Sequence, residues 1–145
     1  MIEVKIHKLD KSAKLPNRMS THAAGYDLYS YHQQNIVLKK GEVELVPTGI
    51  AISLPSGYEA QIRPRSGLAI KHGIGVLNAP GTIDADYRGE IKIILFNFSK
   101  EDFIITPGTR IAQMVIAKHE IVNFAVTEEL DKTTRGSGGF GHTSH

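Results

Sequence analysis

Turn signals at short intervals limit what this chain can fold into more than any other feature. The sequences KKGE, PSGY, NAPG, SKED and TPGT interrupt short apolar runs along most of its length. Short apolar runs with turns between them are typical of strands in a sandwich or barrel. We therefore predict an all-β fold in a single domain, since 145 residues are enough for one hydrophobic core.

Hydrophobic periodicity locates the individual strands. Residues 2–6 alternate apolar with charged side chains, and residues 89–98 begin with the same alternation before becoming apolar on both faces, as in a strand covered on two sides. Residues 110–130 predict one or two long strands, although the AVTEEL at their end also fits the end of a helix. Only RSGLAIK, residues 65–71, predicts a helical turn.

Composition disfavours several classes of function. The 17 basic and 15 acidic residues are interspersed and aromatic residues make up 7% of the chain, so we expect no nucleic-acid partner. There is no cysteine for disulfides or thiolate chemistry. The N-terminus lacks the apolar core of a signal peptide, and no apolar run approaches the ~20 residues that span a bilayer. We expect a cytoplasmic protein without a membrane partner.

Two glycine-containing segments carry charges next to predicted strands. In AGYDLY, an extended backbone would put Asp27 on one face with Gly25 and Tyr29. That carboxylate either hydrogen-bonds a turn or holds a metal-bound water. In RPRSGLA, residues 63–69, two arginines and a Ser-Gly pair lie where the short helix would start, which fits either an ordinary capped turn or an anion site.

The segment NAPGTIDADYRGE, residues 78–90, is the richest in groups that could carry chemistry. NAPG predicts a β-turn or hairpin tip whose unpaired backbone groups could bind a ligand edge. Asp84 and Asp86 are two apart, so an extended strand would put both on one face and Tyr87 on the other. Paired carboxylates suit a general base or a metal site, and they equally suit two solvated acids at a strand end.

Two further segments also leave structural and functional interpretations open. In GTRIAQM, Arg110 and Gln113 interrupt an apolar run, and such a glutamine either satisfies a neighbour's backbone or positions a water. The end of the chain, RGSGGFGHTSH, has the composition of a flexible tail and yet carries Arg135 and Phe140. None of the histidines has the spacing of metal ligands.

In their order along the chain, AGYDLY, PRSGLA, GTIDADYRGE, RIAQM and RGSGGFGHT resemble the five motifs of the trimeric dUTPase family. The resemblance implies a jelly-roll-like, distorted β-barrel core over residues 1–130 and a flexible, glycine-rich C-terminal arm over residues 131–145. It also implies a homotrimer with shared active sites that uses Mg²⁺ to hydrolyse dUTP to dUMP and pyrophosphate. That reaction keeps uracil out of DNA and supplies dUMP for thymidylate synthesis.

The resemblance further implies roles for individual residues. Asp84 would activate the attacking water, Asp27 would support the hydrated metal through a water, and Gln113 would order water and phosphate. The substrate-binding residues would be Asp84 with Arg65, Ser66 and Gly67 at the phosphates, Asn78, Thr82 and Ile83 at uracil, Tyr87 at the deoxyribose, Lys92 beside the site, and Arg135, Gly139, Phe140, Gly141 and Thr143 on the arm. The arm would act as a lid that orders on substrate.

Two other functions fit the same fold. A dCTP deaminase depends on a glutamate in the site, whereas IDADYRGE keeps the aspartate of the hydrolase. A dUTP-binding regulatory protein with little turnover has no need to retain Asp27, Asp84, Gln113 and Arg135 together. Hydrolysis of dUTP is therefore the predicted activity.

Overall fold

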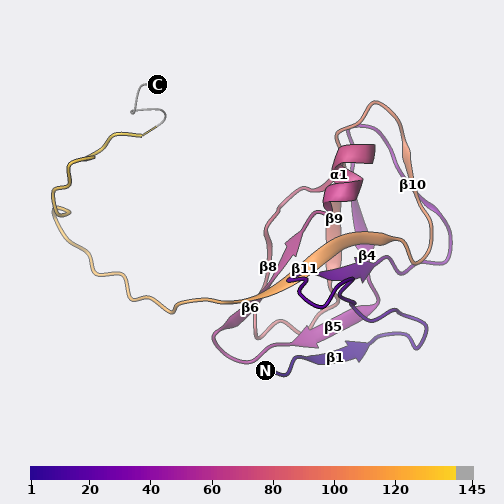
Figure 1. Ribbon diagram of the computed structural model, residues 1–145, viewed down its shortest axis with the longest axis horizontal. Helices are drawn as coiled ribbons and strands as arrows, with labels where there is room; N and C mark the ends of the chain where they lie inside the picture. The colour runs from indigo at the N-terminus through magenta and orange to yellow at the C-terminus, as the bar shows by residue number, and fades with distance from the viewer. Residues whose placement is uncertain (140–145) are drawn as a thin grey trace.

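The structure is a computed structural model that describes residues 1–139, which contain eleven strands and one short helix (Figure 1). The strands are β1 (Lys5–Lys8), β2 (Tyr26–Tyr29), β3 (Ile36–Leu38), β4 (Val43–Pro47), β5 (Ile50–Ser53), β6 (Tyr58–Arg63), β7 (Ile74–Val76), β8 (Gly81–Ile83), β9 (Lys92–Asn97), β10 (Phe103–Ile105) and β11 (Arg110–Lys118). The helix, α1 (Ser66–His72), lies where the sequence predicted a helical turn. The all-β prediction is confirmed.

The strands form four small antiparallel sheets in the described residues. Their strand orders are β2–β11–β6–β8, β4–β9–β7, β1–β5 and β10–β3. Neighbouring strands are mostly distant in the sequence: β11 lies between β2 and β6, and β9 lies between β4 and β7. The sheets enclose one apolar core, as the predicted jelly-roll-like barrel requires.

Aliphatic side chains from all four sheets fill this core. The largest of them that are fully buried are Leu28, Leu38, Val46, Ile50, Ile74, Ile91, Ile93, Leu95, Ile105 and Ile111. Burying one such side chain stabilises the fold by about 1.5–3 kcal/mol, so these positions dominate its stability. Strand β9 keeps its alternation to the end, because Leu95 and Asn97 are buried while Ile94 and Phe96 are only half-buried. The prediction that both of its faces are covered is thus wrong for a single chain.

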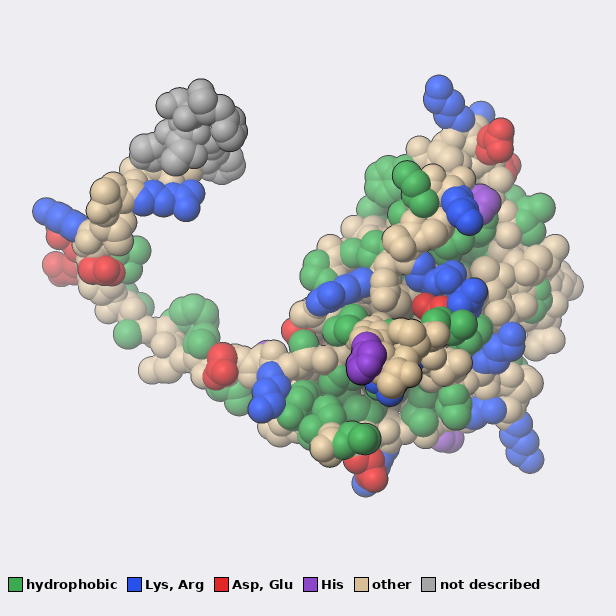
Figure 2. Space-filling view, in the orientation of Figure 1, with side chains coloured by type: hydrophobic (Ala, Val, Ile, Leu, Met, Phe, Trp, Pro, Cys, Tyr) green, Lys and Arg blue, Asp and Glu red, His purple; other side chains and the backbone are tan. Residues whose placement is uncertain are grey.

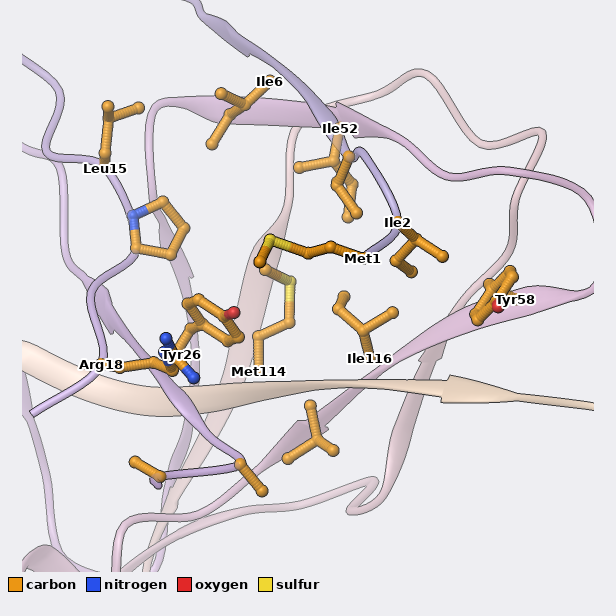
Figure 3. A pocket seen from close by; sticks show the side chains of 15 residues that line it. Met1, Ile2, Ile6, Leu15, Arg18, Tyr26, Ile52, Tyr58, Met114 and Ile116 are labelled. Carbon is orange, nitrogen blue, oxygen red and sulfur yellow. The ribbon is translucent and has the colours of Figure 1, made fainter. Parts of the chain in front are cut away.

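The N-terminal strand lies at an edge of the fold. β1 begins at Lys5 rather than at Ile2, and in the described chain it pairs only with β5. Its one apolar side chain, Ile6, is therefore 38% exposed. Ile2, Ile6, Ile52, Met114 and Ile116 are among the residues that line an apolar cavity of about 580 Å³, which we call the N-terminal groove (Figure 3).

The chain leaves the barrel after β11. That strand ends at Lys118, and the backbone N–H of His119 still donates to the carbonyl of Gly57. Residues 120–139 then run away from the barrel without strand or helix, and the space-filling view shows the same separation (Figures 1 and 2). The strand predicted to continue to residue 130 is wrong for the single chain, because no neighbouring strand among residues 1–139 offers hydrogen-bond partners there.

The division between core and arm at residue 130 stays a prediction. Within residues 1–139, no helix is long and apolar enough to cross a membrane.

Candidate functional site

Asp27 and Gln113 are direct neighbours across the β2–β11 pair. Cross-strand partners face the same side of a sheet, and a side chain at Gly25 would collide with the Gln113 amide. Gly25 and Asp27 therefore share a face, as predicted. The Nε2 of Gln113 donates to the carbonyl of Pro64 at 2.9 Å, which connects β11 to the segment that leads into α1.

The carboxylate of Asp27 is held between two guanidinium groups. Its side chain is 12% exposed, with Arg65 Nε 3.2 Å from Oδ1 and Arg110 Nη1 donating to Oδ2 at 3.0 Å. Arg65 Nη1 also donates to the carbonyl of Arg110 at 2.9 Å. We call Asp27, Arg65, Arg110 and Gln113 the arginine cluster. Two cations around one carboxylate leave a net positive charge, which suits an anionic ligand.

Arg110 received no role from the sequence, although it interrupts an apolar run. A further sign in the sequence is the pair of apolar residues, Ile111 and Ala112, that follows Arg110. In the structure both of them are buried. Two buried neighbours in one strand break the alternation expected of a strand with one covered face.

The helix α1 begins beside the arginine cluster. Its N-cap residue, Arg65, has an extended backbone and makes no side-chain capping bond, so its guanidinium is not used to cap the helix. Ser66 and Gly67 are the first helical residues, and both are exposed. The first N–H groups of any helix lack acceptors within it, so these groups can donate to a phosphate together with Arg65.

A second set of predicted site residues lines a separate cavity of about 410 Å³. Its lining consists of Leu45, Thr82, Ile83, Asp84, Tyr87, Glu90 and Lys92. We call it the β8 cavity.

A turn, not a strand, places Asp84 in the β8 cavity. Strand β8 ends at Ile83, and the N–H of Tyr87 donates to the carbonyl of Asp84 at 3.2 Å. Asp84 and Tyr87 consequently line the same cavity, whereas the sequence predicted them on opposite faces. Asp86 does not line it, so the predicted pairing of Asp84 and Asp86 on one strand face is wrong.

Glu90 organises one wall of this cavity, and no pattern in the sequence indicated it. Its carbonyl accepts a 3.0 Å hydrogen bond from the Tyr87 hydroxyl, and its Oε1 accepts from the N–H of Gly49 at 2.9 Å. Its Oε2 lies 3.7 Å from Lys92 Nζ. The phenol ring of Tyr87 is therefore anchored at its hydroxyl end.

The NAPG turn connects two sheets and is not a hairpin tip. It follows β7, which pairs with β9, and precedes β8, which pairs with β6. The N–H of Ala79 donates to the carbonyl of Val76, and Asn78 is exposed. The hydrogen-bonded turn spans residues 76–79, two residues earlier than the predicted NAPG turn, and the hairpin alternative is wrong because the flanking strands belong to different sheets.

One chain does not bring all the predicted residues together. Asp27 of the arginine cluster lies on β2, and the β8 cavity lies at β8, the opposite edge of the same four-stranded sheet. At ~4.8 Å per strand spacing, these edges are roughly 14 Å apart. Arg135 lies on the arm, where its Nε donates to the carbonyl of Gly138. The predicted Phe140, Gly141 and Thr143 lie outside the described residues.

The comparisons with known proteins agree with the order of the motifs. The model of the dUTPase family matches residues 11–144. The chain belongs to the dUTPase family. It is 60% identical to the deoxyuridine 5'-triphosphate nucleotidohydrolase of Rickettsia felis over 142 residues, which are 97% of this chain and 96% of that protein. The corresponding protein of Rickettsia typhi is also 60% identical, over 144 residues that cover 99% and 97% of the two chains.

Solved dUTPase structures have the same fold. The dUTPase of Staphylococcus bacteriophage 80alpha with dUpNHpp is 27% identical, with a TM-score of 0.85 over 100% of both chains. A mutant of the 80alpha phage dUTPase is 28% identical, with a TM-score of 0.85 over 97% of this chain and 98% of the other. The jelly-roll-like barrel expected from the sequence is confirmed.

The side chains present fit a magnesium ion only through water. Across residues 1–139, no three His, Asp or Glu side chains gather into a cation cage. Both oxygens of Asp27 already contact a guanidinium, and each keeps a lone pair that can accept from a water. Mg²⁺ commonly keeps several waters and binds substrate phosphates, so Asp27 fits the water-mediated role expected of it.

Proposed function

We propose that this dUTPase family member hydrolyses dUTP to dUMP and pyrophosphate, with Asp84 as the general base. The observation that carries the proposal is the turn after β8, which puts Asp84 and Tyr87 on one cavity beside Thr82 and Ile83. A carboxylate at the wall of a nucleoside-sized cavity can take a proton from a water that attacks phosphorus. We also propose that the protein acts in the cytoplasm, which is consistent with the absence of cysteine.

The nucleoside would occupy the β8 cavity. Asn78 and the backbone of Thr82 and Ile83 would hydrogen-bond the uracil edge, and a base with the wrong donors would leave buried polar groups unpaired. Tyr87, anchored through Glu90, would pack on the deoxyribose and leave no room for a 2′-hydroxyl. Lys92 would stand at the cavity wall.

The triphosphate would lie against positive charge. Arg65 and the N–H groups of Ser66 and Gly67 would bind its oxygens, and Gln113 would order water beside them. Arg135 would add a cation from the arm, with Gly139, Phe140, Gly141 and Thr143 closing over the substrate. Bound Mg²⁺ would neutralise phosphate charge, and Asp27 would hold one of its waters.

We further propose a homotrimer in which each site is shared between copies. Asp27 on β2 and the β8 cavity lie at opposite edges of one sheet, so a neighbouring copy can complete the arginine cluster or the cavity. Apolar side chains of the arm are exposed, among them Ile121 at 83% and Phe124 at 89%. The N-terminal groove offers apolar surface of matching character (Figure 3). Within residues 1–139, β1 pairs only with β5. Residues 120–127 of one copy would cover the groove of the next.

Pyrophosphate release from four nucleotides tests the activity. Purified protein with Mg²⁺ should release pyrophosphate from dUTP and hardly at all from dCTP, dTTP or UTP. Equal rates on all four would refute the proposed specificity. Preference for dCTP with release of ammonia would support the deaminase alternative instead.

Subunit mixing tests the sharing of sites. Asp84→Asn and Arg65→Gln should each be nearly inactive alone, since one lacks the base and the other a phosphate contact. Co-expressed with different tags and purified through both, they should recover part of the activity if the two residues of one site come from different copies. Light scattering should give three times the 15.9 kDa chain mass. Mixed protein without recovered activity would place both residues in the same copy.

A further inference from the structure

The pairing of β11 with β2 contains an irregularity at the arginine cluster. Arg110 lies opposite Tyr29, while Ala112 lies opposite Leu28, so β11 has one residue more than β2 over this interval. The additional residue is Ile111, which is fully buried beside the equally buried Ala112. This is the pattern of a β-bulge, which re-aims side chains and is frequent next to active sites.

The bulge determines which face Arg110 occupies. Regular alternation from Gln113 would put Arg110 on the buried face with Ala112. The additional residue instead puts it on the face of Asp27, where its Nη1 donates to Oδ2 at 3.0 Å. The sequence pattern of a single strand does not show this reversal, because the register with β2 sets it.

Arg110 acts on Arg65 in two ways. Its carbonyl accepts from Arg65 Nη1 at 2.9 Å, and its guanidinium occupies the oxygen of Asp27 that Arg65 does not contact. Arg65 is thus fixed at Nε and Nη1, while its Nη2 has no partner within residues 1–139. The Arg65 side chain is 23% exposed, so a ligand can reach it.

We propose that Arg110 is a positioning residue that keeps Arg65 available for phosphate. An arginine beside a carboxylate tends to form two parallel hydrogen bonds with it. Without Arg110, both oxygens of Asp27 could bind the fork of Arg65 and compete with the substrate for it. With Oδ2 occupied by Arg110, Asp27 holds Arg65 at one nitrogen only. This inference rests on the proposed function, in which Arg65 binds the triphosphate.

A double-mutant cycle on the full-length protein tests the inference. Arg110→Gln should weaken binding of dUpNHpp, measured by calorimetry, by about tenfold, while binding of deoxyuridine stays unchanged. In an Arg65→Gln background, Arg110→Gln should weaken dUpNHpp binding little further, because there is no guanidinium left to position. Arg110→Lys should recover part of the affinity, since an ammonium can pair with Oδ2 without reproducing the fork.

Arg63→Gln is the matched control. Arg63 lies opposite Gln113 on β6, and its Nε donates only to Gln61 Oε1 in the described chain, at 3.2 Å. It should bind dUpNHpp like the parent. Unchanged affinity in Arg110→Gln, or losses that add in the double variant, would overturn the inference.

Two further outcomes are informative. If circular dichroism shows that Arg110→Gln does not fold, the same cycle with Arg110→Lys tests the inference. The smaller loss of dUpNHpp affinity caused by Arg110→Lys must then vanish in the Arg65→Gln background. A parent protein that binds dUpNHpp but does not hydrolyse dUTP would refute the proposed function. The cycle would then still show whether Arg110 acts through Arg65.

Discussion

Gly25 and the side-chain amide of Gln113 lie so close together that any side chain at position 25 would displace the amide. A Cβ there would overlap Oε1 of Gln113 and would lie 3.0 Å from its Cδ. Because position 25 has no side chain, there is room for the Gln113 amide at this place. Its Nε2 donates a hydrogen bond to the carbonyl of Pro64. Glycine is therefore favoured at position 25 because of this close contact and not because of its backbone angles.

Gly25→Ala should lower turnover of dUTP by about a hundredfold. The new methyl group displaces the Gln113 amide, and misplacement of a catalytic-site group by about 1 Å costs that order of rate. Steady-state kinetics with thermal melting would measure it. Gly75→Ala is the control, because its Cβ would meet only ordinary contact, at 3.4 Å, with Phe98. Equal activity of the two variants would contradict the account of Gln113.

Gly89→Ala should reduce discrimination between dUTP and UTP by about tenfold, expressed as the ratio of their kcat/KM values. A Cβ at position 89 would stand 2.5 Å from Cζ and 2.9 Å from Cε2 of Tyr87, so the ring must move from the cavity wall. The displaced ring would no longer exclude the 2′-hydroxyl. An unchanged ratio alongside a lower melting temperature would show that the ring contributes packing only.

Asp84→Asn should lower kcat by roughly 10²- to 10⁴-fold, the usual contribution of general base catalysis. The amide keeps the shape of the side chain but cannot accept a proton from water at neutral pH. Affinity for dUpNHpp should stay close to that of the parent. Asp86→Asn is the matched control, since Asp86 does not line the β8 cavity. Turnover within a few-fold of the parent in Asp84→Asn would exclude Asp84 as the base.

Deletion of residues 135–145 should cripple turnover and leave the core folded. The contacts that the structure records for Arg135 and Gly136 are local, to Gly138 and Thr133, so these two residues contribute no core packing within residues 1–139. Deletion from residue 119 onward should also lower the mass measured by light scattering below that of three shortened chains, because it removes the apolar arm that holds the proposed trimer together. Full activity of the shorter deletion would mean that the tail is only a flexible end.

The sequence predicted those features that depend on local pattern. The short apolar runs that form the strands and the helical turn at α1 reflect side-chain facing and turn chemistry within a few residues, which a single sequence contains. The shared face of Gly25 and Asp27 follows from the same alternation. These predictions needed no knowledge of which strands pair.

Features that depend on strand partners could not be predicted. The side on which Arg110 lies is set by the bulge at Ile111, which exists only relative to β2. The placement of Asp84 and Tyr87 on one cavity depends on β8 ending at Ile83. Strand character beyond Lys118 was overpredicted, since an apolar alternating segment forms a strand only where another strand accepts its hydrogen bonds.

The exposed apolar arm also has a consequence for how the chain becomes active. In the proposed trimer a neighbouring copy covers residues 120–127, so the rate of the final step of folding depends on chain concentration. Diluting a refolding reaction should delay the return of activity without delaying the circular dichroism signal of the barrel. Until copies meet, Ile121, Val122 and Phe124 form an unprotected β-prone segment, the kind that promotes aggregation. The rate of synthesis in a cell sets the concentration of new chains, and therefore how long each of them stays prone to aggregation.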